Sequence, residues 1–395
     1  MFELSSQDFQ AMTAFLQDLV RTPSFSTQEG EVAARLVEEM HRVGISDVRV
    51  DRIGNVIGRI GAGEGKKLLL NGHMDTVRVS DPAAWNRDPF GAEVEKGVLY
   101  GRGTADMKGA LAAMVYAAKM LLEAGISLNG DLYVVGVVQE EPCEGLASRI
   151  LIEKEGLRPD WVILGEPSDL QVSRGHRGRV EMKVTVQGKA CHAAMPHQGK
   201  NAIYGAAQII FGLELLADQL AEDRFLGRGS LAVTQIESTA GSRNAVPDRC
   251  SFYIDRRLTL GETEAKALAE VQGVIVREGL QANVEVTEYR AASYTGYEAR
   301  HREYYPPWAM DEGHPLVQAV VQTVRRTLGY TPRIGRWAFS TDGTYTMGVA
   351  GIPTVGFGPG AERHAHTAEE RIRLDDVAAA ARVYAQLAVD LLGQV

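Results

Sequence analysis

Histidine and acidic side chains that could bind metal ions recur along the chain in five short stretches. They are His73 and Asp75 in GHMDTV, Asp106 in GRGTADMKG, Glu140 and Glu141 in VVQEEP, Glu166 in ILGEP, and His366 in HAHTAEE. Four of the stretches follow a run of Leu, Val, Ile, Tyr or Gly, which predicts a buried strand. Ligands bind outside the carboxyl ends of strands in open α/β sheets, so these side chains are expected to converge. Imidazole nitrogens and carboxylate oxygens suit Zn²⁺, Mn²⁺ or Co²⁺, and the set predicts a two-metal hydrolase.

Two adjacent acids, Glu140 and Glu141, could have two different roles at such a centre. Successive side chains of an extended chain point in different directions, so one acid can bind metal while the other faces substrate. A two-metal centre lowers the pKa of a bound water to about 7, and a general base must still accept the proton. Asp75 suits a carboxylate that accepts the second N–H of the His73 imidazole. A lone histidine or acidic pair more often lies on a solvated surface, but five such stretches make that explanation improbable.

Strand and helix patterns alternate up to Arg174, after two helices at the N-terminus. The first of these helices is expected to end before Pro23, and Ser26 with Glu29 predicts a capping box for the second. The elements that follow are strand 67–70, helix 109–122, strand 131–138, helix 146–155 and strand 160–164. This alternation predicts an α/β fold whose mixed, mostly parallel sheet is flanked by helices.

The pattern changes after Arg174 to the order β-α-β-β-α-β, which is a known α+β unit. Its expected elements are strand 180–187, helix 201–220, strands 231–236 and 249–257, helix 263–280 and strand 283–289. A helical pattern resumes at 315–328, and His366 lies beyond it. We therefore expect a discontinuous catalytic domain, residues 1–177 and 293–395, interrupted by a lid domain, residues 178–292. The aromatic segment 294–310 is assigned to neither domain: it is either a cover for the site or a packed surface loop.

The composition excludes several classes of partner. A chain of 395 residues suits two domains, and a net charge of −9 argues against nucleic acid or an anionic membrane. Cys143, Cys191 and Cys250 are far apart, odd in number and without CxxC spacing, so they predict neither disulfides nor a cysteine zinc site. The N-terminus lacks the basic and apolar regions of a signal peptide, and no apolar run approaches the roughly 20 residues of a membrane span. We expect a cytoplasmic protein with no membrane partner.

The motifs together resemble those of the M20 metallopeptidases, which include acetylornithine deacetylase, succinyl-diaminopimelate desuccinylase, glutamate carboxypeptidase and aminoacylase. The resemblance covers nearly the whole chain in the same order. It rests on GHMDTV, GRGTADMKGALAA, EE, GEP, GKACHAAMPHQGKNAI, NAVPDRC with the DRR that follows, and AHTAEE. It implies a catalytic domain of the dinuclear zinc peptidase type with an inserted ferredoxin-like lid and dimerisation domain.

The resemblance also implies a division of the metal ligands. His73 and Glu166 would bind one ion, Glu141 and His366 would bind the other, and Asp106 would bridge the two. The ions would be Zn²⁺, with Co²⁺ or Mn²⁺ as alternatives.

Three further roles follow from the same resemblance. Asp75 would orient the first metal-binding histidine, and Glu140 would act as general base and acid. His192 would reach across a homodimer into the partner's site and stabilise the oxyanion, with helix 201–220 as the contact surface between the lid domains. The peptide bond after Asp106 would be cis.

Substrate-binding residues are implied less sharply. Arg257 and Asn244 match positions that hold the substrate's carboxylate or backbone, and a guanidinium is a natural bidentate partner of a carboxylate. An ion pair at the end of a strand would explain Arg257 equally simply. Weaker candidates are Arg177, Ser340, Thr341, Asp342 and Gly343. A turn packed near the site would account for the last four without any contact to substrate.

The expected function is hydrolysis of an amide bond in a small N-acyl amino acid or short peptide with a free carboxylate. Glu rather than Asp at position 166 favours a deacylase or carboxypeptidase within the family, whereas segment 300–310 departs from its deacetylases and desuccinylases. The alternatives are a dipeptidase or aminopeptidase that acts on unblocked peptides and a metal-binding scaffold without turnover. A phosphate-ester hydrolase would need an Arg or Lys clamp at the strand ends, which the sequence lacks.

Overall fold

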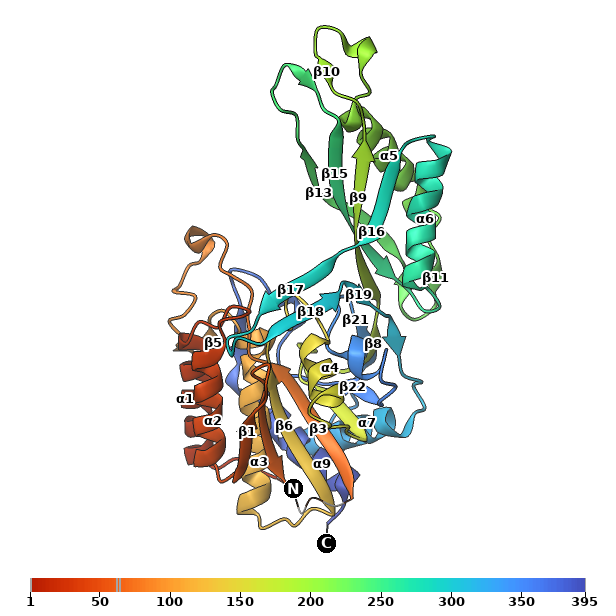
Figure 1. Ribbon diagram of the computed structural model, residues 1–395. Helices are drawn as coiled ribbons and strands as arrows, with labels where there is room; N and C mark the ends of the chain where they lie inside the picture. The colour runs from red at the N-terminus through yellow and green to blue at the C-terminus, as the bar shows by residue number, and fades with distance from the viewer. Residues whose placement is uncertain (1, 62, 64, 395) are drawn as a thin grey trace.

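The computed structural model describes residues 2–61, 63 and 65–394, and two sheets dominate it (Figure 1). The larger sheet has the strand order β1-β2-β6-β3-β7-β22-β8-β20, with β21 beside β8. Its strands are β1 (Asp47–Val50), β2 (Val56–Ile60), β3 (Lys66–His73), β6 (Gly130–Val137), β7 (Trp161–Leu164), β8 (Val172–His176), β20 (Trp308–Ala309), β21 (Ile334–Trp337) and β22 (Thr354–Gly356). Strands β6, β3, β7 and β22 run parallel, and antiparallel pairs flank them. The predicted mixed sheet is confirmed.

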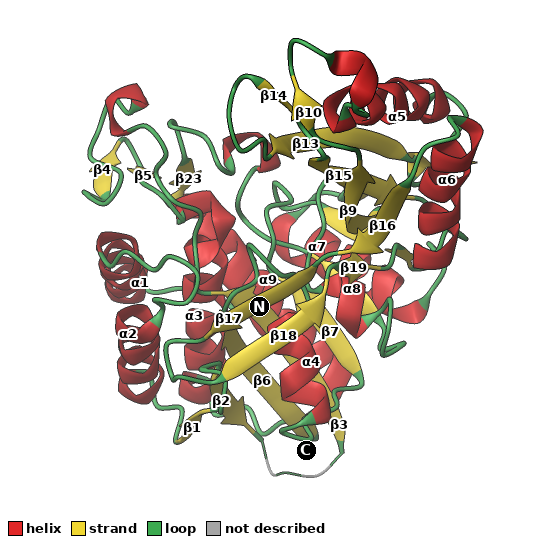
Figure 2. Cartoon of the chain, turned by 45° about the horizontal axis from the view of Figure 1, so that its top comes forward, coloured by secondary structure: helices red, strands yellow, loops and turns green. Residues whose placement is uncertain are grey.

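Helices cover both faces of this sheet, which explains why β6 is buried along its whole length (Figure 2). Successive residues of β3 show the two faces: Asn71 donates to Ser148 of α4 at 3.2 Å, whereas Gly72 faces Leu111 of α3. The helices are α1 (Ser6–Arg21), α2 (Gly30–Arg42), α3 (Gly109–Glu123), α4 (Leu146–Glu153), α7 (Pro315–Leu328), α8 (Gly343–Thr346) and α9 (Leu374–Leu392). Within the described ranges, no helix is long and apolar enough to cross a membrane.

A smaller antiparallel sheet forms a second unit with its own apolar core, which we call the smaller unit (residues 178–286). Its strand order is β13-β15-β9-β16, and helices α5 and α6 pack against it (Figure 1). The elements are β9 (Gly178–Gln187), α5 (Ala202–Ala217), β13 (Ser230–Ser238), β15 (Arg249–Leu258), α6 (Glu264–Arg277) and β16 (Ala282–Val286). Short strands β10 (Cys191–His192) and β14 (Ala245–Val246) pair at its far tip, and β11 (Glu222–Asp223) pairs with β12 (Gly227–Arg228).

The strand expected over 283–289 is divided in two. β16 ends at Val286, and β17 (Glu288–Ala292) pairs instead with β18 (Glu298–Arg302). The expected boundary between residues 292 and 293 thus falls inside a hairpin. The aromatic segment beyond it returns to the sheets: β19 (Tyr304–Tyr305) pairs with β9, and Trp308 pairs with His176 of β8.

Two expectations about the N-terminal half are wrong. Ser26 does not cap α2, because its hydroxyl donates to Asp75 Oδ2 at 2.7 Å and the residue before α2, Glu29, makes no side-chain cap. Asp106 does not follow a strand of the larger sheet either. The preceding strand β5 (Val98–Tyr100) belongs to a separate sheet with β4 (Glu93–Glu95) and β23 (Arg371–Arg373). A turn, η2 (Thr104–Lys108), carries Asp106 and leads into α3.

Candidate metal centre

The predicted ligands converge at the carboxyl edge of the larger sheet. His73 is the last residue of β3, Glu140 and Glu141 follow β6, and Glu166 follows β7. The turn before α3 brings Asp106 to the same place. His366 arrives from a loop after η4 (Glu362–His364), with a left-handed backbone at φ 60°. Ends of neighbouring parallel strands therefore supply part of the cluster, and a helix start and a loop complete it.

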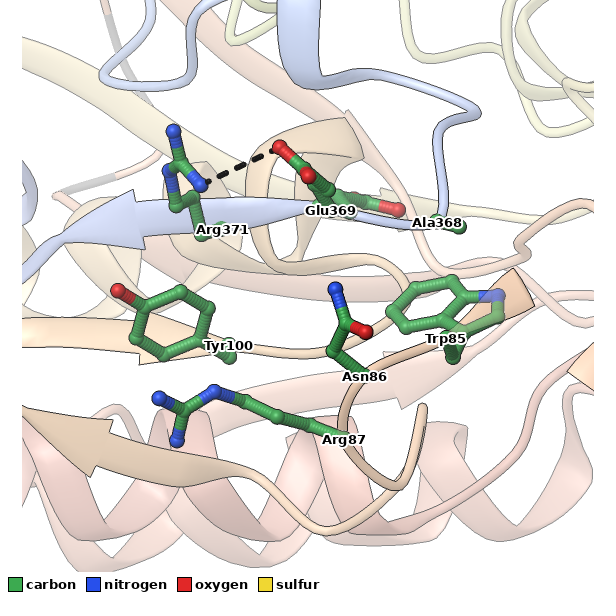
Figure 3. A pocket seen from close by; sticks show the side chains of 8 residues that line it. Trp85, Asn86, Arg87, Tyr100, Ala368, Glu369 and Arg371 are labelled. Carbon is green, nitrogen blue, oxygen red and sulfur yellow. Dashed lines mark ion pairs between the residues drawn. The ribbon is translucent and has the colours of Figure 1, made fainter. Parts of the chain in front are cut away.

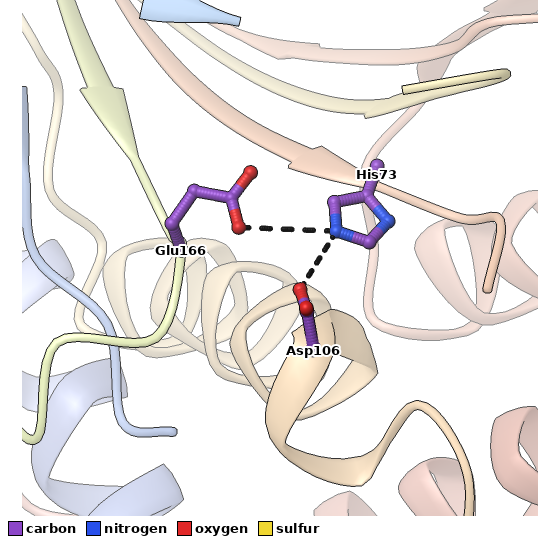
Figure 4. A group of neighbouring side chains, drawn as sticks. All are labelled: His73, Asp106 and Glu166. Carbon is purple, nitrogen blue, oxygen red and sulfur yellow. Dashed lines mark hydrogen bonds and ion pairs between the residues drawn. The ribbon is translucent and has the colours of Figure 1, made fainter. Parts of the chain in front are cut away.

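The first group of ligand atoms is buried. His73 Nε2 lies 3.0 Å from Asp106 Oδ1 and 3.8 Å from Glu166 Oε2 (Figure 4). All three side chains are less than a tenth exposed, and the His73 ring is 1% exposed. Their ligand atoms lie close enough together to surround one cation.

The second group shares Asp106 and opens to solvent. His366 Nε2 lies 3.0 Å from Glu141 Oε2 and 3.3 Å from Asp106 Oδ2. The two carboxylate oxygens of Asp106 thus face one group each, which is the arrangement of a bridging carboxylate. The His366 side chain is 51% exposed.

The charges of the cluster suit bound cations. Burial raises the pKa of Glu140 and Glu166 well above its ordinary value, because water no longer solvates their charges. Burial alone would lower the pKa of His73, but the charge of Glu166 and the hydrogen bond to Asp106 outweigh it and raise the pKa. Hydrogen bonds to Asp106 and Glu141 raise the pKa of His366 to about 10. Divalent ions would replace these protons, so the donor set fits a metal pair.

Asp75 holds the site differently from the expected carboxylate–imidazole contact. His73 Nδ1 lies 2.8 Å from the backbone oxygen of Asp75 and 3.8 Å from its carboxylate. The carboxylate instead accepts the backbone N–H groups of Glu140 at 3.1 Å and Glu141 at 3.2 Å, and the hydroxyl of Ser26. Asp75 therefore joins the histidine of β3 to the acidic turn after β6.

A second positioning acid, Glu370, was not predicted from the sequence. Its carboxylate accepts the backbone N–H groups of Ala105 at 3.1 Å and Asp106 at 3.2 Å, and it pairs with Arg102. The peptide bond between Asp106 and Met107 is cis, as the resemblance implies. The second glutamate of AHTAEE was the available signal for Glu370.

A hollow with about 400 Å³ of open space lies beside Glu370, at the edge of the three-stranded sheet of β4, β5 and β23. Its walls include the rings of Trp85 and Tyr100, with Arg371 above them 3.7 Å from Glu369 (Figure 3). None of the predicted site residues lines this pocket.

A cleft with about 920 Å³ of open space is lined by four of the five predicted metal ligands. Its lining residues are Asp106, Glu140, Glu141, Glu144, Glu166, Arg179, Arg257, Phe339, Ser340, Glu362, Ala365 and His366. Arg257 lies in the cleft and is paired with Asp255 at 2.7 and 3.0 Å. Arg179, which the sequence analysis did not single out, pairs with Glu144 at 2.9 Å and lies over the ring of Tyr305.

Most of the weaker substrate candidates lie behind the cleft wall. Asp342 is buried and accepts hydrogen bonds from Asn71, Gly145 and Ser148. The backbone of Thr341 donates to His176, and Gly343 packs against Trp308, where a Cβ would lie 2.5 Å from the indole. Arg177 donates to the carbonyl of Arg228. Of this set, only Ser340 lines the cleft.

His192 and Asn244 lie together at the tip of the smaller unit. His192 pairs with Ala245 across the β10–β14 ladder, and Ala193 donates to the carbonyl of Asn244 at 2.8 Å. Both side chains are exposed, and neither lines the cleft of their own chain. The β10 label in Figure 1 marks this tip.

Comparison with known sequences decides the family. The profile of peptidase family M20/M25/M40 matches residues 69–390. The chain belongs to this family. The M20 resemblance of the motifs is confirmed, and the chain is a hydrolase by family membership.

Relatives of this M20 protein cover nearly its whole length. The uncharacterized Escherichia coli K12 protein YgeY is 41% identical over 98% of this chain and 96% of its own. Succinyl-diaminopimelate desuccinylase of Pseudomonas fluorescens is 27% identical over 95% of this chain and 96% of its own. The M20 family metallo-carboxypeptidase Sso-CP2 of Sulfolobus solfataricus has a similar structure, with a TM-score of 0.76, 20% identity, and coverage of 98% of this chain and 100% of that one.

Proposed function

We propose that this protein hydrolyses the amide bond of a small N-acyl amino acid or short peptide with a free carboxylate, using two divalent metal ions. The main support is the position of Asp106 between two His/Glu pairs, with a further buried acid, Glu140, in the same cleft. Glu140 Oε1 is buried and has no hydrogen-bond partner among the described residues. An unpaired carboxylate in that position suits a group that accepts a proton.

The chain offers a complete ligand set for the metal pair. His73 and Glu166 would hold one ion, His366 and Glu141 the other, and Asp106 both; Zn²⁺, Co²⁺ and Mn²⁺ all suit these donors. When bound, such ions lower the pKa of water and polarise the substrate carbonyl.

The remaining steps belong to side chains of the cleft. Glu140 would accept the proton of the attacking water and pass it to the leaving amine. Arg257 keeps donors beyond those that Asp255 occupies, so it would bind the substrate carboxylate, with Arg179 on the same wall. Substrates with a free carboxylate are therefore favoured over neutral amides.

A peptidase that acts on unblocked peptides is the second candidate, and Glu362 favours it. Its carboxylate lines the cleft, and no cation lies within ion-pair distance of it in the part of the chain that the structure describes. A free α-amino group would suit this carboxylate, whereas an acyl-blocked substrate offers it no cation.

We also propose a homodimer in which His192 serves the partner's cleft. Helix α5 presents an outward apolar face whose residues Tyr204, Phe211 and Leu215 are 66–69% exposed. Contiguous apolar surface of this kind favours association. His192 is remote from its own cleft, so pairing along α5 would offer it to another copy, where it would stabilise the oxyanion.

Turnover of a mixed panel tests the hydrolase proposal. The panel contains N-acetyl, N-succinyl and N-carbamoyl amino acids with free dipeptides, each assayed with Zn²⁺-, Co²⁺- or Mn²⁺-loaded and chelator-treated protein. Metal-dependent release from the blocked compounds supports the deacylase, and release from dipeptides alone supports the peptidase. Glu140→Gln should retain two metals and lose about 10²–10⁴-fold in turnover. The surface variant Glu38→Gln should match the wild type, and full activity of Glu140→Gln would contradict the assigned base.

Subunit mixing tests the role of His192. His192→Ala and Glu140→Gln are each expected to be inactive as homodimers. A mixed dimer has one cleft with an intact base and an intact histidine from the other chain, so mixing should restore activity. Absence of recovery in dimers shown to exchange subunits would contradict a role for His192 across the dimer.

A further inference from the structure

The hairpin of β17 and β18, here called the ribbon (residues 288–302), connects the two units of the molecule. Its strands pair from Glu288 with Arg302 to Ala292 with Glu298. It continues directly from β16, and Thr287, the residue between them, donates to the carbonyl of Glu181 in β9 at 3.0 Å. In Figures 1 and 2 the ribbon runs from the base of the smaller unit across the larger one. No ribbon residue lines the cleft.

The ribbon is fixed to the larger unit near its hairpin end. Tyr294 donates to the carbonyl of Gly54 at 2.9 Å, and Thr295 donates to the carbonyl of Arg52 at 2.7 Å. The Tyr294 ring lies so close to Gly54 that a Cβ there would come within 2.3 Å of it. This anchor lies beside α2 and holds the ribbon without any contact to the metal-ligand cluster.

A second anchor lies next to the proposed base. Tyr289 of β17 donates its hydroxyl to Gln139 Oε1 at 2.8 Å, and Gln139 directly precedes Glu140. Gln139 is fully buried and has a left-handed backbone, with φ 56°. A residue other than glycine keeps such a conformation only where its surroundings hold it.

Two carboxylates also hold the turn that carries Glu140. Glu29 Oε1 accepts the backbone N–H of Gln139 at 3.0 Å and that of Thr27 at 2.9 Å. The carboxylate of Asp75 accepts the N–H groups of Glu140 and Glu141. The side-chain oxygen of Gln139 has Tyr289 as its partner, and its Nε2 has no partner among the described residues. Removal of the tyrosine hydroxyl would therefore leave a buried amide with no partner for either polar atom.

We infer that Tyr289 is a positioning residue for the reaction: through Gln139 it fixes the turn that carries Glu140, and it links that turn to the smaller unit. The inference rests on the proposed function, because it assigns importance to the position of Glu140 as the base. It assigns the ribbon a role beyond joining two units, since β17 follows directly on β16 of the smaller unit and carries Tyr289, which contacts the residue beside the base.

Hydrogen exchange on the full-length protein tests the inference without a substrate. Tyr289→Phe removes one oxygen and keeps the ring. We expect amide exchange in the peptide that covers 138–142 to become about tenfold faster or more, since the opening of that turn becomes easier. The matched control is Tyr294→Phe, which removes the same atom from the other anchor and should leave 138–142 unchanged. Equal exchange of that peptide in Tyr289→Phe and wild type would overturn the inference.

Kinetics on the panel compound that the wild type hydrolyses gives the second readout. Displacement of the base predicts a roughly tenfold lower kcat for Tyr289→Phe, with KM within about twofold and metal content unchanged. Gln139→Met should give the same loss, and the double variant should lose no more than either single one. Should Tyr289→Phe fail to fold, Gln139→Met carries both measurements.

The two ideas fail in different ways. An active Glu140→Gln would remove the proposed function, whatever the ribbon does to exchange. Wild-type kcat and exchange in Tyr289→Phe, with an inactive Glu140→Gln, would overturn the positioning role alone.

Discussion

The two halves of the metal-ligand cluster share Asp106 but differ in what holds them. His73 ends a strand in the middle of the larger sheet, its ring is 1% exposed, and its Nδ1 is fixed by the backbone oxygen of Asp75. His366 stands on a loop, and its side chain is 51% exposed. Strand ends therefore supply His73 and Glu166 of the first half, whereas the second half combines Glu141, which follows β6, with His366 on a loop.

This difference suggests that one half holds its ion rigidly and that the other gives solvent and substrate access to the metals. A ligand on a packed strand is presented in one geometry, so an ion held by His73 and Glu166 is expected to be well retained. A ligand on an exposed loop leaves room for solvent and substrate, which a catalytic site requires. His366 and Glu141 line the cleft together with Arg257 and Ser340, whereas the His73 side chain is not part of its lining.

The largest effect is expected at the residue that the halves share. Asp106→Asn keeps the shape of the side chain and removes the charge that faces both histidines. Turnover should fall by about a thousandfold or more, because the site loses several kcal/mol of transition-state stabilisation, and both metals should bind more weakly. Elemental analysis and kcat/KM check this, with the surface variant Asp18→Asn as control. Retention of two metals with near-normal turnover would show that Asp106 does not join the halves.

Separate histidine variants should distinguish the halves. His366→Ala should lose the ion of the open half and retain the one held by His73 and Glu166, so about one metal per chain should remain. His73→Ala removes a buried ligand at a packed strand end and should weaken retention at the buried half. Metal content after dialysis against graded chelator measures both, and the wild type should release its ions in two steps. Equal retention in the two variants would contradict the asymmetry.

Sequence patterns predicted the position of the ligands in the buried half better than that of the ligands in the open half. His73 and Glu166 each end an apolar run of the kind that forms a covered strand, and their place at one sheet edge follows from that pattern. The helix expected over 315–328 has those bounds, since Pro315 starts it and Gly329 caps it.

Other features depend on contacts between distant residues, which local patterns do not contain. Ser26 and Glu29 have the spacing of a capping box, but tertiary contacts use Ser26 for Asp75 and Glu29 for Gln139. Asp342 is a weak substrate candidate by sequence, with a packed turn as the alternative, and the structure has it accept hydrogen bonds from Asn71 of β3 and Ser148 of α4. Arg179 and Glu144 pair although they are 35 positions apart in the sequence, and no sequence motif indicates this contact.

Asp75 contacts His73 of the buried half and the backbone of Glu141 in the open half. Its loss should therefore reduce metal binding moderately in both halves. Asp75→Asn replaces one of the oxygens that accept the N–H groups of Glu140 and Glu141 with a donor. Turnover or metal affinity should fall by about 10–100-fold, which is typical for groups that orient metal ligands. Ser26→Ala removes a single hydrogen bond to the same carboxylate and should cost less. Metal titration and kcat compare the two variants, and equal effects would argue against Asp75 as the link.

The smallest effect concerns the open half without metal. Its acids raise the pKa of His366 to about 10, above the ordinary value of 6.5, so the folded chain holds that proton more tightly than the unfolded chain. The resulting stability is fully present below pH ~6.5 and is lost as pH rises toward ~10. Chelator-treated wild type should therefore lose more Tm between pH 7 and 10 than His366→Gln does. Groups that do not contact His366 are common to both proteins, so the difference reports on His366 together with Asp106 and Glu141. Parallel Tm curves would show that the loop does not hold His366 against Asp106 and Glu141 when the ions are removed, and the open half would then form only with metal.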